Sequence, residues 1–263
     1  MRRETMPGNI KIFASVGRNG TNHFGDVTIV QQLINLNRAY LQRPIAVDGL
    51  CGPATISAIE AVQRRDRLMA RPTGKLEPDD PTFSSLTRSI RAEALVSLPI
   101  AWGARVSAEF KARLIEAAGN IAVDPNLLIS AIAFETGETF SPWITNASGA
   151  TGLIQFTRDT AAELGTSTAE LAAMTDVDQM EFVERYFQPY RNMLKTIEDV
   201  YMAILWPAAI GKSNSMVLFS RPSAEYERNS GLDTDKDGCV TKEEAAAMVR
   251  AKLLKGRGAG YFG

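Results

Sequence analysis

The segment that starts at Asp124 limits the fold more than any other part of the sequence. Asp124 is a favourable helix N-cap, Pro125 suits a first helical turn, and the apolar run Leu127–Phe134 follows directly. The pattern predicts a helix that ends near Glu135, because Gly137 favours helix termination. Helical patterns continue through most of the following sequence and strand signals are sparse, so we expect a mainly α fold.

Composition excludes several classes of function. Of the 263 residues, 45% are apolar and 22% charged, and the formal net charge of −1 provides no basic field for nucleic acid. No apolar run reaches the roughly 20 residues of a membrane span. We therefore expect a monomer that binds neither nucleic acid nor a membrane. Arg2 and Arg3 near the start precede no apolar stretch, since Pro7, Gly8 and Asn9 interrupt it, so synthesis in a host cytoplasm without a secretion signal is expected.

Acid–base chemistry in this chain must depend mainly on carboxylates. His23 is the only histidine, which disfavours most zinc sites and the Ser-His-Asp or Cys-His arrangements of nucleophilic enzymes. Glu135 follows the apolar run, and burial among apolar groups raises the pKa of a carboxyl. A glutamic acid that stays protonated near neutral pH can donate its proton to a glycosidic oxygen. Glu135 is therefore the candidate catalytic acid.

A glycine-rich loop at residues 148–157 provides candidate substrate-binding groups. Gly149 and Gly152 have no side chains, so a sugar chain can approach the backbone closely there. Gln155 can donate and accept hydrogen bonds with a sugar or its N-acetyl group. Trp206 and Trp143 are candidates for stacking on a sugar ring, although a tryptophan more often belongs to a core.

The first third of the chain combines three predicted helices with tight turns. An apolar helical pattern from Val27 is followed by the turn Val47–Pro53, a helix that starts at Pro53, turns over residues 72–81 and a short helix over residues 82–86. These sequence motifs resemble those of the three-helix peptidoglycan-binding domain. The resemblance implies such a domain over residues 1–87, with a tail at 1–16, then a linker or helix over 88–108.

Two further motifs resemble the lytic transglycosylase and goose-type lysozyme superfamily. Glu135-Thr136 is similar to its Glu-Ser motif, and Gly152-Leu153-Ile154-Gln155 to its Gly-Leu-Met-Gln motif, in the same order. The resemblance implies a lysozyme-like α-helical catalytic domain over 109–263 that cleaves the MurNAc–GlcNAc β-1,4 bond of peptidoglycan glycan strands. It assigns catalysis to Glu135 without a cofactor. Substrate contacts would come from Thr136, Gly152 and Gln155, to which we add Trp206.

Two mechanisms remain open at this point. In a lytic transglycosylase, Glu135 alone protonates the leaving oxygen and then deprotonates the C6 hydroxyl of MurNAc, which gives a 1,6-anhydro product. A hydrolytic muramidase needs a second carboxylate, for which Glu138, Asp159 and Glu163 are candidates. The superfamily's third motif, Ala-Tyr-Asn, is missing, and residues 201–208 occupy its expected place. This leaves open which group supports Glu135.

Residues 233–244 match an EF-hand calcium loop position by position. The ligand positions hold Asp233, Asp235, Asp237, the carbonyl of Cys239 and Glu244, and Gly238 occupies the sharp turn. Hard oxygen ligands of this number suit Ca²⁺. We expect one structural calcium ion.

A wall-binding domain followed by a glycosidase is similar to the endolysins of giant phages that infect Gram-negative bacteria. The expected role is therefore host cell lysis, with action on the cell wall in the periplasm. A secreted antibacterial effector fits the same chemistry. A non-catalytic wall-binding or virion structural protein is the alternative from another class.

Overall fold

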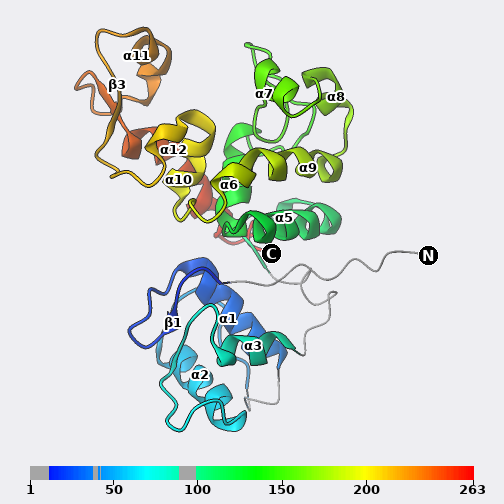
Figure 1. The fold of residues 1–263 in the computed structure, drawn as a ribbon, viewed down its shortest axis with the longest axis vertical. Coiled ribbons are helices and arrows are strands. Elements are labelled where there is room, and N and C mark those ends of the chain that lie inside the picture. Colours follow the sequence, from blue (N-terminus) through cyan, green and yellow to red (C-terminus); the bar gives the residue numbers. More distant parts are fainter. Residues whose placement is uncertain (1–11, 38–40, 42, 89–98) are drawn as a thin grey trace. The chain divides into compact units, whose positions relative to one another are not determined.

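The computed structural model describes residues 12–37, 41, 43–88 and 99–263, and is mainly helical, as expected (Figure 1). The chain divides into two compact units, residues 1–98 and 99–263. Residues 1–11, which include the segment expected to lack a secretion signal, lie outside the described part. The same holds for residues 89–98 of the expected linker.

The first unit contains three helices and one two-stranded antiparallel sheet among its described residues. The helices are α1 (Phe24–Leu36), α2 (Pro53–Arg65) and α3 (Pro81–Arg88), and β1 (Val16–Gly17) pairs with β2 (Lys75–Leu76). Two expectations were wrong here. Lys75–Leu76 is a strand instead of a turn, and residues 12–16 are no loose tail, because Ile12 and Val16 are buried in the core of this unit.

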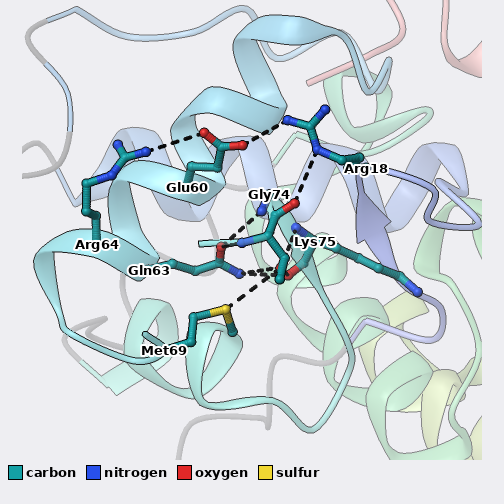
Figure 2. Close-up of polar contacts among 8 residues, drawn as sticks. Arg18, Glu60, Gln63, Arg64, Met69, Gly74 and Lys75 are labelled. Carbon is teal, nitrogen blue, oxygen red and sulfur yellow. Dashed lines mark hydrogen bonds and ion pairs between the residues drawn. The ribbon is translucent and has the colours of Figure 1, made fainter. Parts of the chain in front are cut away.

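Two buried glutamines fix the loops of this unit in the same way. The Gln31 Oε1 accepts from the amides of Asp48 and Gly49, while its Nε2 donates to the Leu50 carbonyl. The Gln63 Oε1 likewise accepts from the Thr73 and Gly74 amides, and its Nε2 donates 2.7 Å to the Lys75 carbonyl (Figure 2). Each amide side chain satisfies loop groups that burial would otherwise leave unpaired. In both loops of the first unit, a buried glutamine side chain therefore pairs with the loop backbone.

The second unit is built from eight helices and one hairpin among its described residues. The hairpin pairs β3 with β4 in antiparallel fashion. The bounds are α5 (Ala108–Ile121), α6 (Pro125–Glu135), α7 (Arg158–Glu163), α8 (Thr168–Ala173), α9 (Asp176–Phe187), α10 (Ile197–Leu205), α11 (Ala224–Asn229), α12 (Lys242–Gly256), β3 (Val217–Ser220) and β4 (Cys239–Thr241).

All eight helices of this unit begin after a residue whose side chain caps them. In each, a hydroxyl or carboxylate oxygen accepts a hydrogen bond from an amide of the first turn, which otherwise lacks a partner. The caps are Ser107, Asp124, Thr157, Ser167, Thr175, Thr196, Ser223 and Thr241. The helix starts are therefore encoded locally.

Helix α6 lies at the centre of the second unit, packed against α5, α10 and α12 (Figure 1). All nine residues from Pro125 to Ala133 are buried, as is usual for a helix that is apolar on most sides. Within the described residues, no single helix has the length and apolarity of a membrane span. Together, α5 and α6 have this length and apolarity, but the two helices are bent by 116° where they join.

The second unit differs from the expected one in three respects. Ile100, Ala101 and Trp102, placed by expectation in the linker, are buried in its core. The sequence pattern from Asp176 predicts a helix to Leu194, but α9 stops at Phe187, because Pro189 cannot continue an α-helix. The helices α8 and α11 and the hairpin were not anticipated, since these segments are short and carry no clear periodicity.

Candidate active site

Glu135 is the last residue of α6, where the chain reverses in a Schellman turn. The Glu138 amide donates 2.7 Å to the Ala133 carbonyl, and the Gly137 amide donates 3.2 Å to the Phe134 carbonyl. Gly137 has a φ of +58°, the left-handed conformation that this turn requires. The predicted helix end at Gly137 is therefore confirmed.

The carboxyl of Glu135 has the electrostatic properties of a general acid. Burial raises the pKa of Glu135 to about 7, because the charged form loses hydration. No hydrogen bond or ion pair joins this carboxyl to any residue that the structure describes. A carboxyl with this pKa is partly protonated at neutral pH and can donate a proton to a bound oxygen.

Two tyrosines lie close enough to Glu135 for its charge to affect them. Burial, and secondarily the Glu135 carboxylate, raises the pKa of Tyr201. The pKa of Tyr186 rises to about 12, mainly through burial, with smaller contributions from Tyr190, Glu135 and Glu163. The Tyr186 hydroxyl donates 2.8 Å to the Ala203 carbonyl, whereas no such bond engages the Tyr201 hydroxyl within the described part of the chain. Tyr201 is the first residue of the segment that occupies the expected place of the third motif.

Thr136, predicted to bind substrate, is fully buried. Its hydroxyl donates 2.7 Å to the Ile132 carbonyl and accepts 3.1 Å from the Phe140 amide. Successive residues of a helix point about 100° apart, so the fully buried Thr136 and the partly buried Glu135 point in different directions. The prediction of a substrate contact was wrong, and Thr136 instead fixes the turn that follows Glu135.

Gly152 makes room for a protein side chain. A Cβ at this position would lie 2.3 Å from the Gln179 Oε1. The fully buried Gln179 accepts 2.6 Å from the Leu153 amide and donates to the carbonyls of Pro142 and Leu171, at 3.0 and 2.7 Å. The expected role of Gly152 in a close sugar approach is thus replaced by a structural one. Gln179 was missed, because nothing in its local sequence marks it.

Replacing Gly152 by Ala is expected to destabilise the protein by about 3–5 kcal/mol, because it forces an unfavourable φ and displaces Gln179 from its three hydrogen bonds. Gly149→Ala is the matched control: Gly149 also has a positive φ, +85°, but no atom lies within 4 Å of the added Cβ. We expect about 1 kcal/mol for this variant. Denaturant unfolding measures both, and equal losses would exclude a role for Gln179.

Gln155 lies in the loop as predicted, but its amide is partly engaged by the protein. Its Nε2 donates to the carbonyls of Gly152 and Ile144, at 3.0 and 3.2 Å. The Oε1 has no bond of this kind within the described ranges, so it is the atom available to a ligand. Among the described residues, no hydrogen bond joins Gln155 to Glu135. The loop 139–144, which follows the Glu135 turn, connects them through Ile144.

The same loop forms one wall of a cavity of about 910 Å³. Trp143 lines this cavity and is 68% exposed, and the buried Ser141 Oγ has no hydrogen-bond partner. Arg105, Ser107, Met174 and Asp176 also line this cavity, whereas Glu135 and Gln155 do not. Trp206 is 38% exposed and packs edge-to-face on Phe219, with ring centres 5.3 Å apart. Trp143 is therefore the more exposed of the two aromatic surfaces.

The candidates for a second carboxylate differ in environment. Glu138 accepts from the ammonium groups of Lys252 and Lys255, at 2.6 and 2.5 Å, and these bonds lower the pKa of Glu138. Asp159 and Glu163 are exposed on α7. Glu138 is thus ionised and committed to two lysines.

The predicted calcium loop brings its acidic side chains together. Oxygens of Asp233, Asp235 and Asp237 lie within 4.8 Å of one another. Asp233 is 7% exposed, and its Oδ1 is buried without a hydrogen-bond partner. Glu244 reaches back to the start of the loop, where its Oε1 accepts 3.1 Å from the Thr234 amide. An unpaired buried carboxylate oxygen is costly without a cation, so these residues fit a Ca²⁺ ion.

Comparison with models of known protein families gave no match, and no curated protein matched the chain in sequence. The motifs and the geometry of the described residues are therefore the basis for a function.

Proposed function

We propose that the chain degrades peptidoglycan by cleaving the MurNAc–GlcNAc β-1,4 bond, with Glu135 as the general acid. The observation that carries this proposal is the position of Glu135 at the end of a buried apolar helix, where burial raises the pKa of its carboxyl to about 7. The motifs around Glu135 and Gln155 support a lysozyme-like domain. The three-helix first unit, with its two glutamine-fixed loops, supports a peptidoglycan-binding domain.

In the proposed reaction, protonated Glu135 donates its proton to the glycosidic oxygen while the C1–O bond breaks. The resulting carboxylate then accepts the proton of the MurNAc C6 hydroxyl, and O6 bonds to C1. The product carries a 1,6-anhydro end and no water is consumed. The Tyr201 hydroxyl stays protonated, because its pKa is raised, and is the available donor to the Glu135 carboxylate between the two steps.

The two ion pairs of Glu138 with lysines favour this transglycosylase reaction over hydrolysis. Hydrolysis with inversion or retention needs a second carboxylate near the sugar. Glu138 is the nearest acid in the sequence, and both of its oxygens accept from lysine ammonium groups. A reaction that uses one carboxyl twice needs no such partner.

Mass spectrometry of digested peptidoglycan tests the reaction. We expect fragments with 1,6-anhydro-MurNAc ends, each lighter by one water than a hydrolytic product. Reducing MurNAc ends would instead indicate a muramidase, with Asp159 and Glu163 as the candidates for its second carboxylate. Intact glycan strands under all conditions would favour a non-catalytic wall-binding protein.

Trp143 is the position where we expect a sugar ring to stack. Trp143→Ala should raise the KM for soluble glycan strands by up to about tenfold, the effect of losing one aromatic contact, and leave the melting temperature nearly unchanged. Trp206→Ala is the matched comparison, since it removes packing on Phe219 and should lower the melting temperature instead. The opposite pattern would assign the stacking role to Trp206.

The biological role that we propose is a phage endolysin, made in the host cytoplasm and active on the wall in the periplasm. A wall-binding unit joined to a glycosidase unit is suited to repeated cleavage on one insoluble substrate, because binding by one unit keeps the other near its target. Asp233, Asp235, Asp237, Glu244 and the Cys239 carbonyl would hold one Ca²⁺. That ion would neutralise the charge of these carboxylates at the start of α12, outside the reacting groups.

A further inference from the structure

The turn after Glu135 is joined to a distant helix by two ion pairs. Lys252 and Lys255, one turn apart on α12, each donate to a different oxygen of Glu138, at 2.6 and 2.5 Å. The Lys255 ammonium also lies over the rings of Trp102 and Tyr261, at 5.6 and 5.2 Å from their centres. The Glu138 carboxylate is therefore fixed between two cations, and one of these is itself fixed by aromatic rings.

The backbone at Glu138 makes a glutamate an unexpected residue there. Its φ is +70°, a left-handed conformation that glycine adopts readily and that costs other residues energy. Glu138 is also the residue whose amide closes the Schellman turn on Ala133. A side chain that is kept at a strained position, with both oxygens paired, points to a role for the side chain itself.

Helix α12 is a rigid support for these two lysines. The buried Lys242 at its start donates to the Asp199 Oδ1 at 2.6 Å and to the carbonyls of Ala209 and Lys212 at 3.0 Å. Further along, Arg250 pairs with Glu198 at 2.6 Å. Both acids belong to α10, the helix that also carries Tyr201. Helix α10 therefore both holds α12, which carries the two lysines, and carries Tyr201, a neighbour of Glu135.

We propose that Glu138 is a positioning residue, and that the Lys252–Glu138–Lys255 clamp fixes the end of α6 so that Glu135 presents its carboxyl to the scissile oxygen. This inference rests on the proposed function. Glu138 itself touches neither the substrate nor the transferred proton. Small errors in the placement of a catalytic group are costly, and a shift of about 1 Å can reduce a rate by about 100-fold.

Glu138→Gly separates positioning from general stability. It removes the clamp and relieves the strained φ, so we expect an equal or higher melting temperature together with a kcat reduced by about 10–100-fold and an unchanged KM on soluble glycan strands. Lys252→Met should lower kcat in the same direction with Glu138 in place. The double variant Lys252→Arg/Lys255→Arg keeps both ion pairs and should keep most of the activity.

A readout that does not depend on activity completes the test. The pKa of the Glu135 carboxyl can be measured by NMR titration of protein with ¹³C-labelled glutamate side chains. In Glu138→Gly, this pKa should fall toward that of an exposed glutamate. Unchanged kcat and unchanged titration in this variant would overturn the clamp, and so would an activity loss that simply follows the melting temperature. If wild-type protein leaves peptidoglycan intact, the proposed function fails, while the titration still decides whether the clamp positions Glu135.

Discussion

Glu135→Gln is expected to slow the clearing of outer-membrane-permeabilised Gram-negative cells by about 10²–10⁴-fold, the range that a positioned general acid contributes. Glutamine has nearly the shape of the protonated acid but has no proton to donate at this pKa. For the same reason, wild-type activity should fall about tenfold per pH unit above pH 7, where burial places the pKa of Glu135. Glu181→Gln, which neutralises an exposed acid on α9, is the matched control and should clear cells like wild type.

The same variant should be more stable than wild type at alkaline pH. A carboxyl whose pKa is higher in the folded than in the unfolded state favours folding fully only below its ordinary value of about 4.3, and this contribution is lost as the pH rises through about 7. Glu135→Gln removes the charged form altogether. We therefore expect almost no difference in unfolding free energy near pH 4 and a gain of about 3 kcal/mol above pH 8.

Two results would contradict this assignment. Equal clearing by the variant and by wild type would exclude Glu135 as the acid. A stability difference that is the same at both pH values would show that the Glu135 carboxyl is hydrated and ionises like an exposed one.

The parts of the site that the sequence predicted depend on local signals. Asp124 and Pro125 mark the start of α6 and Gly137 marks its end, and the calcium loop lies within twelve consecutive positions. Capping, helix termination and loop ligation each depend on residues that are close in the sequence, so one segment contains all the information.

The parts that could not be predicted are contacts between distant segments. Gln179 fills the space beside Gly152, and Lys252 and Lys255 reach Glu138 across more than a hundred residues. No local pattern distinguishes these side chains from ordinary surface or core residues. Thr136 is different, because helix geometry alone places it on another side of α6 than Glu135. A motif of two adjacent helical residues therefore cannot place both side chains against the same substrate.

Removal of calcium is expected to lower the melting temperature of the second unit by roughly 5–10 °C. An ion present at about 100 times its dissociation constant contributes about 2.7 kcal/mol, and each kcal/mol shifts the midpoint of a domain of this size by roughly 2–4 °C. Tryptophan fluorescence reports on this unit alone, since Trp102, Trp143 and Trp206 all belong to it. EDTA should lower the midpoint, added Ca²⁺ should restore it, and an unchanged curve would exclude a bound structural ion.

Asp235→Asn tests whether the effect comes from this loop. Asparagine keeps an oxygen that can accept from the Asp237 amide but removes one negative charge beside Asp233 and Asp237. Without calcium, weaker repulsion should make the variant equal to or more stable than wild type. With calcium, the lost ligand charge should make it less stable, so the order of the two proteins reverses. Glu243→Gln removes an exposed charge next to the ligand position at Glu244 and should respond to calcium like wild type. A calcium response in Asp235→Asn as large as in wild type would place the ion elsewhere in the chain.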